Sequence, residues 1–375
     1  MTLLDLSAAF DTLEHMIMNN RLDTHINISG TALNWFKSYL SNRTQRVVIN
    51  QNHSCETTLK FGVPQGSVLG PILYSIYILP IGNIIRKHGL SFHIYADDTQ
   101  LYISCHPNEV DAAIRKLEKC ICEIREWMAK NFLCLNADKT ELIIFGSKSV
   151  TEKIGKISIK VGDQIIKSSD CVRNLGAMMD SNLSMKNHVN LICRGAWYHL
   201  RRIGQIRQYL DDDTAEKLIH AYVSSKLDFM NGLIYGLPNI LLDKLKRVQY
   251  AAARIARRVP KHTHMTPVLR DLHWLPVACR IEYKLLLIVF KALHGQAPKY
   301  LCDLLVQQTN SRSLRSSSQC LLVVPKTQTV TYGDRSLTYA AAKLWNILPH
   351  HIKMSPSLSC FKTSLKTCLF QKSYD

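Results

Sequence analysis

The clearest periodicity of apolar positions along the chain lies in residues 108–130. Apolar side chains there recur at alternating spacings of four and three, which lines them up along one face of a helix. These side chains are Val110, Ile114, Leu117, Ile121, Ile124 and Met128. The pattern predicts one amphipathic helix that packs against a sheet.

Runs of β-forming residues on both sides of this helix indicate the strands of the sheet. "TLLDLSAAFD" (residues 2–11) predicts a buried strand. Further strands are expected at 44–50, 55–61 and 141–145, and in hairpins over 92–104 and 156–168. Residues 31–40 are expected to form a helix, and "GVPQGSVLGPILYSIYI" (62–78) a glycine-rich loop that opens another. Strands and helices in this mixed order predict an α+β fold.

Beyond about residue 183 the pattern becomes mostly helical. Asp213 and Glu216 fit an N-terminal capping box. A later helical stripe consists of Leu242, Leu245, Val248, Ala252, Ile255 and Val259. We therefore divide the chain into residues 1–182, a helical part at 183–310, and a tail at 311–375 that starts with the Ser-rich basic linker "SRSLRSSSQ" and is expected to form a small C-terminal module.

Charge is distributed unevenly between the two halves. The 375 residues carry 47 Lys and Arg against 29 Asp and Glu, a net charge of +18. Residues 1–150 hold 14 basic and 14 acidic side chains, so residues 151–375, with 33 and 15, supply the whole excess of 18. An excess of this size favours a polyanionic partner.

One segment of the helical part is especially basic. Asp243 is the only acidic residue beside a run of cations in this segment. A solvated charged face and a phosphate-binding face would both explain such a run. The excess of cations over acids favours phosphate binding. The cations are Lys244, Lys246, Arg247, Arg254, Arg257 and Arg258. We expect alanine at Arg254, Arg257 and Arg258 to weaken binding to all sequences alike and to lower its salt dependence.

Cysteine usage and targeting signals favour an intracellular protein. The 12 cysteines follow no repeating interval and include no CxxC pair, which is typical of reduced thiols. No signal peptide is visible, and the longest apolar run, Leu285 to Phe290, is far too short to span a bilayer, so no membrane partner is expected.

Three carboxylates stand out as candidate chemistry. Asp97 and Asp98 are adjacent in "FHIYADDTQLYIS", and Asp5 lies between leucines that we expect to bury it, at a cost of several kcal/mol unless a cation compensates. If the hairpin lies beside the strand of Asp5, the three acids converge. Two Mg²⁺ ions would relieve their repulsion, and such a pair supports in-line phosphoryl displacement. The residues thus predict a nucleotidyl-transfer site, although a DD pair alone is a weak signal.

Five segments, in order, resemble the motifs of reverse transcriptases of LINE-type retrotransposons, which lack long terminal repeats. The segments are "LLDLSAAFDTLEH", "GVPQGSVLGPILYSIYI", "YADDTQLY", "LNADKTELIIFG" and "NLGAMMD". The basic helical region and the tail are also similar to the C-terminal part of such polyproteins. The resemblance implies a right-hand polymerase with palm and partial fingers over residues 1–182, and a basic helical thumb and connection over 183–310.

The resemblance also implies roles for single residues. Asp5 and Asp97 would bind two Mg²⁺ ions, or Mn²⁺, with Asp98 completing the acidic cluster and the carbonyl of Leu6 as a further ligand. The nucleotide and template would contact Phe10 as a steric gate that selects deoxynucleotides, and also Gln65, Gly66 and Lys139. Leu175 and Gly176 would form the primer grip. The implied partners are an RNA template, a DNA primer and deoxynucleoside triphosphates; synthesis would take place in the cytoplasm and function in the nucleus.

The family places a fingers segment before the first carboxylate motif and an endonuclease further upstream. Because neither precedes Asp5 here, the sequence is expected to be N-terminally truncated and to polymerise weakly or not at all. The strand of Asp5 is expected to lie near a frayed terminus.

Two other functions stay open. The chain could be a non-catalytic RNA- or DNA-binding remnant that uses the basic half. It could also be an RNA-templated RNA polymerase, against which the bulky Phe10 argues. Asp97→Asn and Asp98→Asn separate catalysis from binding, and a preference for ribonucleotides would indicate the RNA polymerase.

Overall fold

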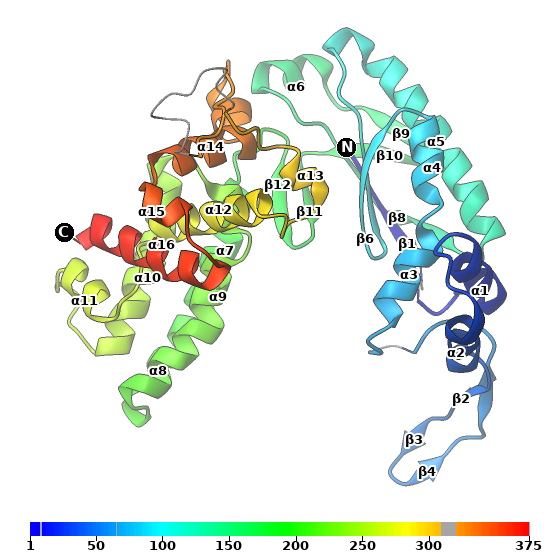
Figure 1. Cartoon of the computed structure of the whole chain (residues 1–375), viewed down its shortest axis with the longest axis horizontal. Coiled ribbons are helices and arrows are strands. Elements are labelled where there is room, and N and C mark those ends of the chain that lie inside the picture. The colour runs from blue at the N-terminus through cyan, green and yellow to red at the C-terminus, as the bar shows by residue number, and fades with distance from the viewer. Residues whose placement is uncertain (8–9, 65, 309–319, 375) are drawn as a thin grey trace. The chain divides into compact units, whose positions relative to one another are not determined.

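The computed structural model describes residues 1–7, 10–64, 66–308 and 320–374. The chain divides into two compact units (Figure 1). We call residues 1–174 with 180–182 the sheet unit, and residues 175–179 with 183–375 the helical unit. The Ser-rich segment 311–319 lies outside the described residues.

A six-stranded sheet organises the sheet unit. Its strands, in spatial order, are β6 (Ser91–Tyr95), β7 (Asp98–Tyr102), β1 (Thr2–Ser7), β8 (Cys134–Ile143), β10 (Gln164–Ser169) and β9 (Ser158–Val161). Neighbours are antiparallel except β8 and β10, which are parallel. Thr2 of β1 pairs with Leu101 on one side and with Leu142 on the other. The expectation that the strand of Asp5 lies near a frayed terminus is wrong, because β1 is paired on both edges from Thr2 and Met1 N donates to Ile143 O at 2.8 Å.

Side chains of β1 alternate between the two faces of the sheet. Leu4 and Leu6 are buried in the core, whereas Asp5 points to the opposite face and is only half-buried. The expectation that neighbouring leucines bury Asp5 is therefore wrong, because successive residues of a strand face opposite ways.

Helices supply the rest of the core of the sheet unit. The predicted amphipathic helix is confirmed as α5 (Val110–Lys130), and Leu117, Ile121 and Ile124 on its stripe are buried in the same cluster as Leu4 and Leu6. The other helices are α1 (His15–Thr24), α2 (Gly30–Leu40), α3 (Gly70–Ile78), α4 (Ile81–Lys87) and α6 (Lys148–Ile154). The predicted helix at 31–40 and the loop that opens a helix at 62–78 are thus confirmed.

A hairpin joins α2 to the glycine-rich loop. It consists of β2 (Arg43–Gln45), β3 (Val48–Ile49), β4 (Asn52–His53) and β5 (Thr57–Leu59), with β2 paired to β5 and β3 to β4. The turn lies at Asn50 and Gln51, both with positive φ.

The described part of the helical unit contains ten α-helices, and its buried side chains form two clusters that both include residues of α12. The helices are α7 (Lys186–Ile206), α8 (Asp212–Ile219), α9 (Ser225–Asp228), α10 (Asn239–Arg257), α11 (Met265–Asp271), α12 (Val277–Leu293), α13 (Lys299–Cys302), α14 (Leu337–Ile347), α15 (His350–Lys353) and α16 (Leu358–Tyr374). The tail packs on α12, where Phe290 stacks on Phe361 at 4.2 Å between ring centroids and Trp345 is fully buried. The boundary between the units runs through the segment of β11 (Cys171–Asn174) and β12 (Ala177–Asp180).

Two local expectations in the helical unit are wrong. The N-cap of α8 is Asp211, whose carboxylate accepts a hydrogen bond from Thr214 N at 2.6 Å, and not Asp213. Helix α10 ends at Arg257, so Val259 lies beyond it, and its buried side includes Leu241 where the sequence pattern indicated Leu242. Among the described residues, no helix is long and apolar enough to cross a membrane.

Candidate active site and nucleic-acid interface

The register of the sheet brings the three candidate carboxylates together. Leu3 of β1 lies opposite Gln100 of β7, and Leu4 lies opposite Thr99. Continuing this antiparallel pairing by one residue sets Asp5 opposite Asp98. Residues about ninety positions apart in the sequence thus meet at one end of two central strands.

The hairpin that carries Asp97 is tight. Tyr95 of β6 pairs with Asp98 of β7, which leaves Ala96 and Asp97 as a two-residue turn. Ala96 has φ of +50°, a left-handed conformation that costs a non-glycine residue about 1 kcal/mol or more. The rigid strands on both sides hold this strained turn beside β1.

The proximity of these acids has an electrostatic consequence for Asp98. Partial burial raises the pKa of the Asp98 carboxyl above its ordinary value, and the negative charges of Asp97 and Asp5 raise it further. Burial also raises the pKa of the Tyr74 hydroxyl, with a contribution from the charge of Asp97. Tyr74, a fully buried residue of α3 that the sequence reading missed, therefore lies within electrostatic range of Asp97.

A bulge in β8 brings Lys139 to this cluster. Leu3 pairs with Glu141 and Asp5 with Asn136, so β8 has extra residues between these two pairs. Lys139 Nζ lies 3.4 Å from Asp5 Oδ2. Bulges of this kind redirect side chains near functional sites.

Asn136, which the sequence reading also missed, holds this bulge in shape. Its side-chain oxygen accepts a hydrogen bond from Lys139 N at 3.3 Å, and its carbonyl accepts one from Thr140 Oγ1 at 2.8 Å. The mostly polar segment "NADKT" (residues 136–140) interrupts an otherwise apolar strand, and it is the one signal in the sequence that could have indicated the bulge.

The glycine-rich loop is tied to the segment after β1. Val63 N donates to Phe10 O at 3.0 Å, and Gly62 N donates to Leu13 O at 2.7 Å. Gly66 has φ of +78° with open space where a Cβ would be, so its backbone is accessible to a close-lying ligand. Gln65 lies outside the described residues.

Phe10 lies in a turn after β1. The expectation that it continues along the strand is wrong, because β1 ends at Ser7. Its ring packs against Tyr74 with centroids 4.9 Å apart, and it is half-buried at the edge of the core. Tyr74 is therefore a neighbour of both Phe10 and Asp97.

Leu175 and Gly176 form the turn between β11 and β12 and belong to the helical unit. Both have positive φ, and a Cβ on Gly176 would lie 3.1 Å from the ring of Phe229. Just before this turn, Asn174 accepts a hydrogen bond from Gln100 of β7 at 2.7 Å, and both of these residues belong to the sheet unit. The carbonyl of Leu6, the remaining candidate ligand, lies on β1 where Leu6 pairs with Leu135.

The donors suit a divalent cation by their chemistry. Carboxylate oxygens are the ligands that Mg²⁺ prefers, and a cation would relieve the repulsion that raises the pKa of Asp98. Within the described part of the chain, however, no group of three or more His, Cys, Asp or Glu side chains is arranged to hold a metal ion.

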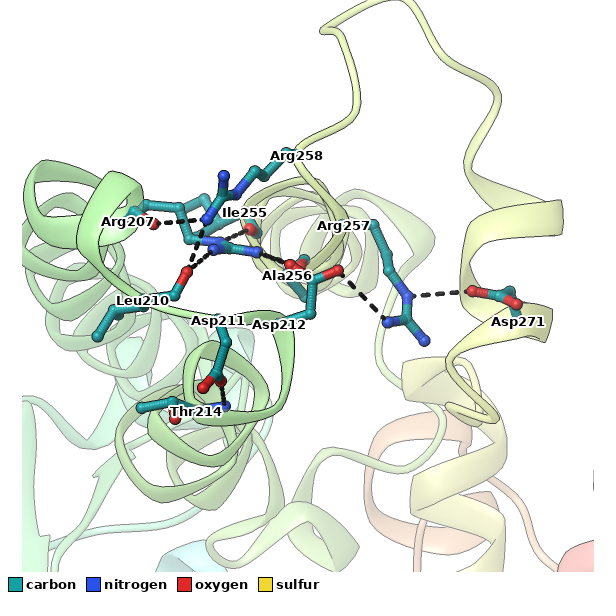
Figure 2. A network of polar contacts seen from close by, with 10 residues as sticks. All are labelled: Arg207, Leu210, Asp211, Asp212, Thr214, Ile255, Ala256, Arg257, Arg258 and Asp271. Carbon is teal, nitrogen blue, oxygen red and sulfur yellow. Dashed lines mark hydrogen bonds and ion pairs between the residues drawn. The ribbon is translucent and has the colours of Figure 1, made fainter.

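The six candidate phosphate-binding cations, which lie on α10 and at the residue after it, differ in their contacts within the fold. Arg257 pairs with Asp271 at 3.0 Å and with Asp212 at 3.9 Å, and Arg258 donates to Leu210 O at 2.6 Å (Figure 2). Lys244 donates to Asn190 Oδ1 at 2.8 Å, and Arg254 is half-buried. Lys246 and Arg247 are exposed. The last two are the members of the set best placed for phosphate.

A buried arginine that the sequence reading missed organises this region. Arg207 donates to the carbonyls of Ile255 at 2.7 Å, Leu210 at 2.6 Å and Ala256 at 2.8 Å, and it also pairs with Asp212 (Figure 2). It is 7% exposed and joins the end of α7 to the end of α10. Several cations of the helical unit are thus structural.

Comparison with known proteins adds a family to this geometry. The family model described as "Reverse transcriptase (RNA-dependent DNA polymerase)" matches residues 1–179. Residues 1–179 therefore form a reverse transcriptase domain.

Two curated relatives indicate which reverse transcriptases this domain resembles. The "Probable RNA-directed DNA polymerase from transposon BS" of Drosophila melanogaster is 26% identical over 63% of this chain and 27% of its own length. The "RNA-directed DNA polymerase from mobile element jockey" of Drosophila funebris is 24% identical over 68% of this chain and 28% of its own length. The chain thus spans little more than a quarter of each relative. The resemblance to reverse transcriptases of LINE-type, non-long-terminal-repeat retrotransposons is confirmed.

A solved structure of telomerase from Candida albicans in complex with the TWJ fragment of telomeric RNA is also similar. It covers 76% of this chain and 48% of its own, with a TM-score of 0.32 and 12% sequence identity.

Proposed function

We propose that this chain carries out RNA-directed DNA synthesis, by transfer of a deoxynucleotide onto a primer 3′-hydroxyl. The observation that carries the proposal is the strand register that sets Asp5 opposite Asp98, next to the turn at Asp97, with their charges coupled. Clustered carboxylates with one nearby cation are the residue types that metal-assisted nucleotidyl transfer requires.

Asp5, Asp97 and Asp98, with the carbonyl of Leu6, would hold two divalent cations, Mg²⁺ or Mn²⁺. The bound cations would supply charge neutralisation and lower the pKa of the attacking hydroxyl. Lys139, whose Nζ lies 3.4 Å from Asp5, would face the triphosphate and donate a proton to the leaving pyrophosphate.

The remaining site residues would position the substrates. The ring of Phe10 would exclude a ribonucleotide 2′-hydroxyl. Gln65 and Gly66 would support the template and the incoming nucleotide, and Leu175 with Gly176 would contact the primer end. The substrates would be an RNA template, a DNA primer and deoxynucleoside triphosphates.

We also propose the division of labour between the parts of the chain. Residues 1–182 would form the palm with partial fingers, residues 183–310 a basic thumb and connection, and 311–375 a tail. The protein would be made in the cytoplasm and act on chromosomal DNA in the nucleus.

Primer extension tests the proposal. The full chain, given a primed RNA template, deoxynucleotides and Mg²⁺, is expected to add nucleotides slowly, and Asp97→Asn is expected to reduce the rate by roughly 100-fold or more. Asp163→Asn, an exposed carboxylate in the turn of the β9–β10 hairpin, is the matched control and should leave the rate unchanged. Equal rates for the wild-type chain and Asp97→Asn would refute the assignment.

Metal binding provides a second readout that does not need turnover. Electron paramagnetic resonance of Mn²⁺ should detect binding by the wild-type chain and by Asp163→Asn, and loss of binding in Asp97→Asn. Absence of both extension and Mn²⁺ binding in the wild-type chain would contradict the proposal.

A non-catalytic nucleic-acid-binding remnant is the second candidate function. The observation in its favour is that the described side chains include no ready three-ligand metal group, while the helical unit carries exposed cations. This alternative expects primer–template binding that is indifferent to both Asp97→Asn and Mg²⁺.

A further inference from the structure

One face of α7 gathers large aromatic and basic side chains at its surface. Trp197 is 46% exposed and Tyr198 is 58% exposed, although helices of a packed core usually bury such residues. Exposed arginines precede and follow them one helical turn away. The face consists of Arg194, Trp197, Tyr198, Arg201 and Arg202.

The opposite face of α7 accounts for its packing. Ala196, Leu200 and Ile203 are buried in the core of the helical unit. Spacings of three and four therefore separate the helix into one core side and one exposed side. The exposed rings are not needed to hold α7 in place.

The charge of this face has one sign. The sequence of α7 contains no Asp or Glu, but it does contain four cations that are all exposed: Lys186, Arg194, Arg201 and Arg202. Among the ion pairs of the described residues, none involves these four. They differ in this respect from Arg207 and Arg257, whose charges are neutralised within the unit.

The rings are already arranged by stacking contacts. The guanidinium of Arg202 lies 5.5 Å from the ring centroid of Tyr198. His199 stacks on the exposed Tyr222 at 5.2 Å with an interplanar angle of 21°, and the Tyr198 ring meets the edge of His199 at 85°. The surface thus holds flat rings in fixed orientations next to cations.

We propose that this face of α7 binds single-stranded nucleic acid, with unpaired bases stacked on Trp197 and Tyr198 and phosphates contacted by Arg194, Arg201 and Arg202. Aromatic platforms bordered by cations are the general chemistry of such sites. Bases buried inside a duplex present no face to these rings, so the surface selects unpaired nucleotides. This site is distinct from the carboxylate cluster of the sheet unit and needs no metal.

Fluorescence anisotropy of the full chain with labelled oligonucleotides tests the site, in a buffer that contains a chelator. The ligands are a single-stranded RNA, the DNA of the same sequence, an abasic DNA of the same length and a blunt duplex. Both base-containing single strands should bind more tightly than the abasic strand, which keeps the phosphates and lacks the bases. The difference should be roughly 5- to 150-fold per stacked base.

Substitutions assign the effect to the two rings. The double variant Trp197→Ala with Tyr198→Ala should reduce affinity for the base-containing strands to that for the abasic strand, and Trp197→Phe with Tyr198→Phe should restore most of it. Trp35→Ala is the matched control, since Trp35 is 54% exposed on α2 of the sheet unit. A single strand should also quench the tryptophan fluorescence of the wild-type chain, and Trp197→Phe should remove that quenching.

Salt dependence assigns the phosphate contacts. Arg201→Gln with Arg202→Gln should lower the slope of log affinity against log salt by roughly 0.7 for each lost contact, whereas the alanine variants at the rings should leave the slope unchanged.

Three results would overturn the site: no binding of single strands by the wild-type chain, equal affinity for abasic and base-containing strands, or unchanged affinity in the double alanine variant. Because these measurements use neither metal nor turnover, their failure is distinct from a failure of the polymerase proposal. A preference of RNA over DNA would identify the template strand as the occupant, and the reverse would identify the primer or target strand.

Discussion

In the sheet unit three carboxylates lie together beside a single lysine, whereas in the helical unit most of the described arginine contacts are with carbonyl or carboxylate oxygens. Asp98 has a raised pKa because Asp5 and Asp97 add to the cost of burial. Arg207, by contrast, has three carbonyls and Asp212 as partners. The sheet unit keeps clustered negative charge at its strand ends, whereas several arginines of the helical unit have partners within the fold.

This difference teaches that the net charge of a region overstates its binding surface. Arg280 pairs with Asp228, and Arg335 donates to Leu183 O at 2.7 Å and Tyr235 O at 3.2 Å, all within the helical unit. Only part of the excess of 18 positive charges therefore faces solvent. Exposed cations include those of α7 and also Lys246 and Arg247 of α10.

The largest expected effect concerns the tail. Trp345→Ala should lower the free energy of unfolding of the helical unit by about 3–5 kcal/mol, because this ring is 1% exposed and its loss leaves a large cavity. Chemical denaturation with a probe in each unit should show a shift of the helical transition alone. An equal shift of the sheet unit would contradict the division into two units.

A smaller effect separates structural from exposed arginines. Arg207→Ala removes a donor from three carbonyls, of which the contact with Ala256 O is buried, and also removes the partner of Asp212, so it should cost about 3 kcal/mol of stability. Arg247→Ala, at an exposed position of α10, should change stability by less than about 0.5 kcal/mol while lowering the salt dependence of nucleic-acid binding. Urea unfolding and anisotropy on the same two variants check both halves of this expectation.

The contacts of Arg257 and Arg258 change the interpretation of the variant with alanine at Arg254, Arg257 and Arg258, which was expected to bind nucleic acid more weakly. Arg257 and Arg258 hold Asp212, Asp271 and Leu210, so weaker binding by that variant could follow from a loosened fold. If Arg247→Ala matched Arg207→Ala in stability loss, the distinction between the two classes would be wrong.

The smallest effect is the pH dependence of the carboxylate cluster. A raised pKa means that folded Asp98 holds its proton more tightly than the unfolded chain does, so the ionised carboxyl opposes folding at neutral pH. This destabilisation is lost as the pH falls from the raised pKa of folded Asp98 to the ordinary pKa of an Asp side chain. Asp98→Asn should therefore raise the melting temperature slightly at neutral pH in the absence of metal, and the gain should vanish in acid.

Asp163→Asn is again the control for the pH series, and its melting curve should follow that of the wild-type chain. A gain for Asp98→Asn that stayed constant from neutral to acid pH would mean that repulsion within the cluster does not cause it.

Several elements could be predicted from local patterns, and the failures have physical causes. The stripe of α5 and the hairpin of Asp97 and Asp98 follow from periodicity and turn signals. The alternation along "LLDLS" also predicts that Asp5 faces away from the buried leucines, because successive residues of a strand face opposite ways. Three consecutive aspartates, 211–213, made the N-cap of α8 ambiguous.

Other features depend on tertiary contacts and have no local signature. The bulge that carries Lys139 exists because β8 must pair with β1 on both sides of Asn136. The contacts of Arg207 join residues about fifty positions apart. Its place four residues after Ile203 continues the buried stripe of α7, whereas Arg201 and Arg202 lie on the opposite face. Helical periodicity therefore places Arg207 toward the core, but it does not identify the carbonyls that this side chain contacts.

The most direct test of the central claim is addition of a single labelled deoxynucleotide to a primed RNA template by the wild-type chain, Asp97→Asn and Asp163→Asn, with and without Mg²⁺. The account predicts Mg²⁺-dependent addition by the wild-type chain and Asp163→Asn, and roughly 100-fold less by Asp97→Asn with primer–template binding retained. Addition at the same rate by Asp97→Asn and the wild-type chain would contradict it.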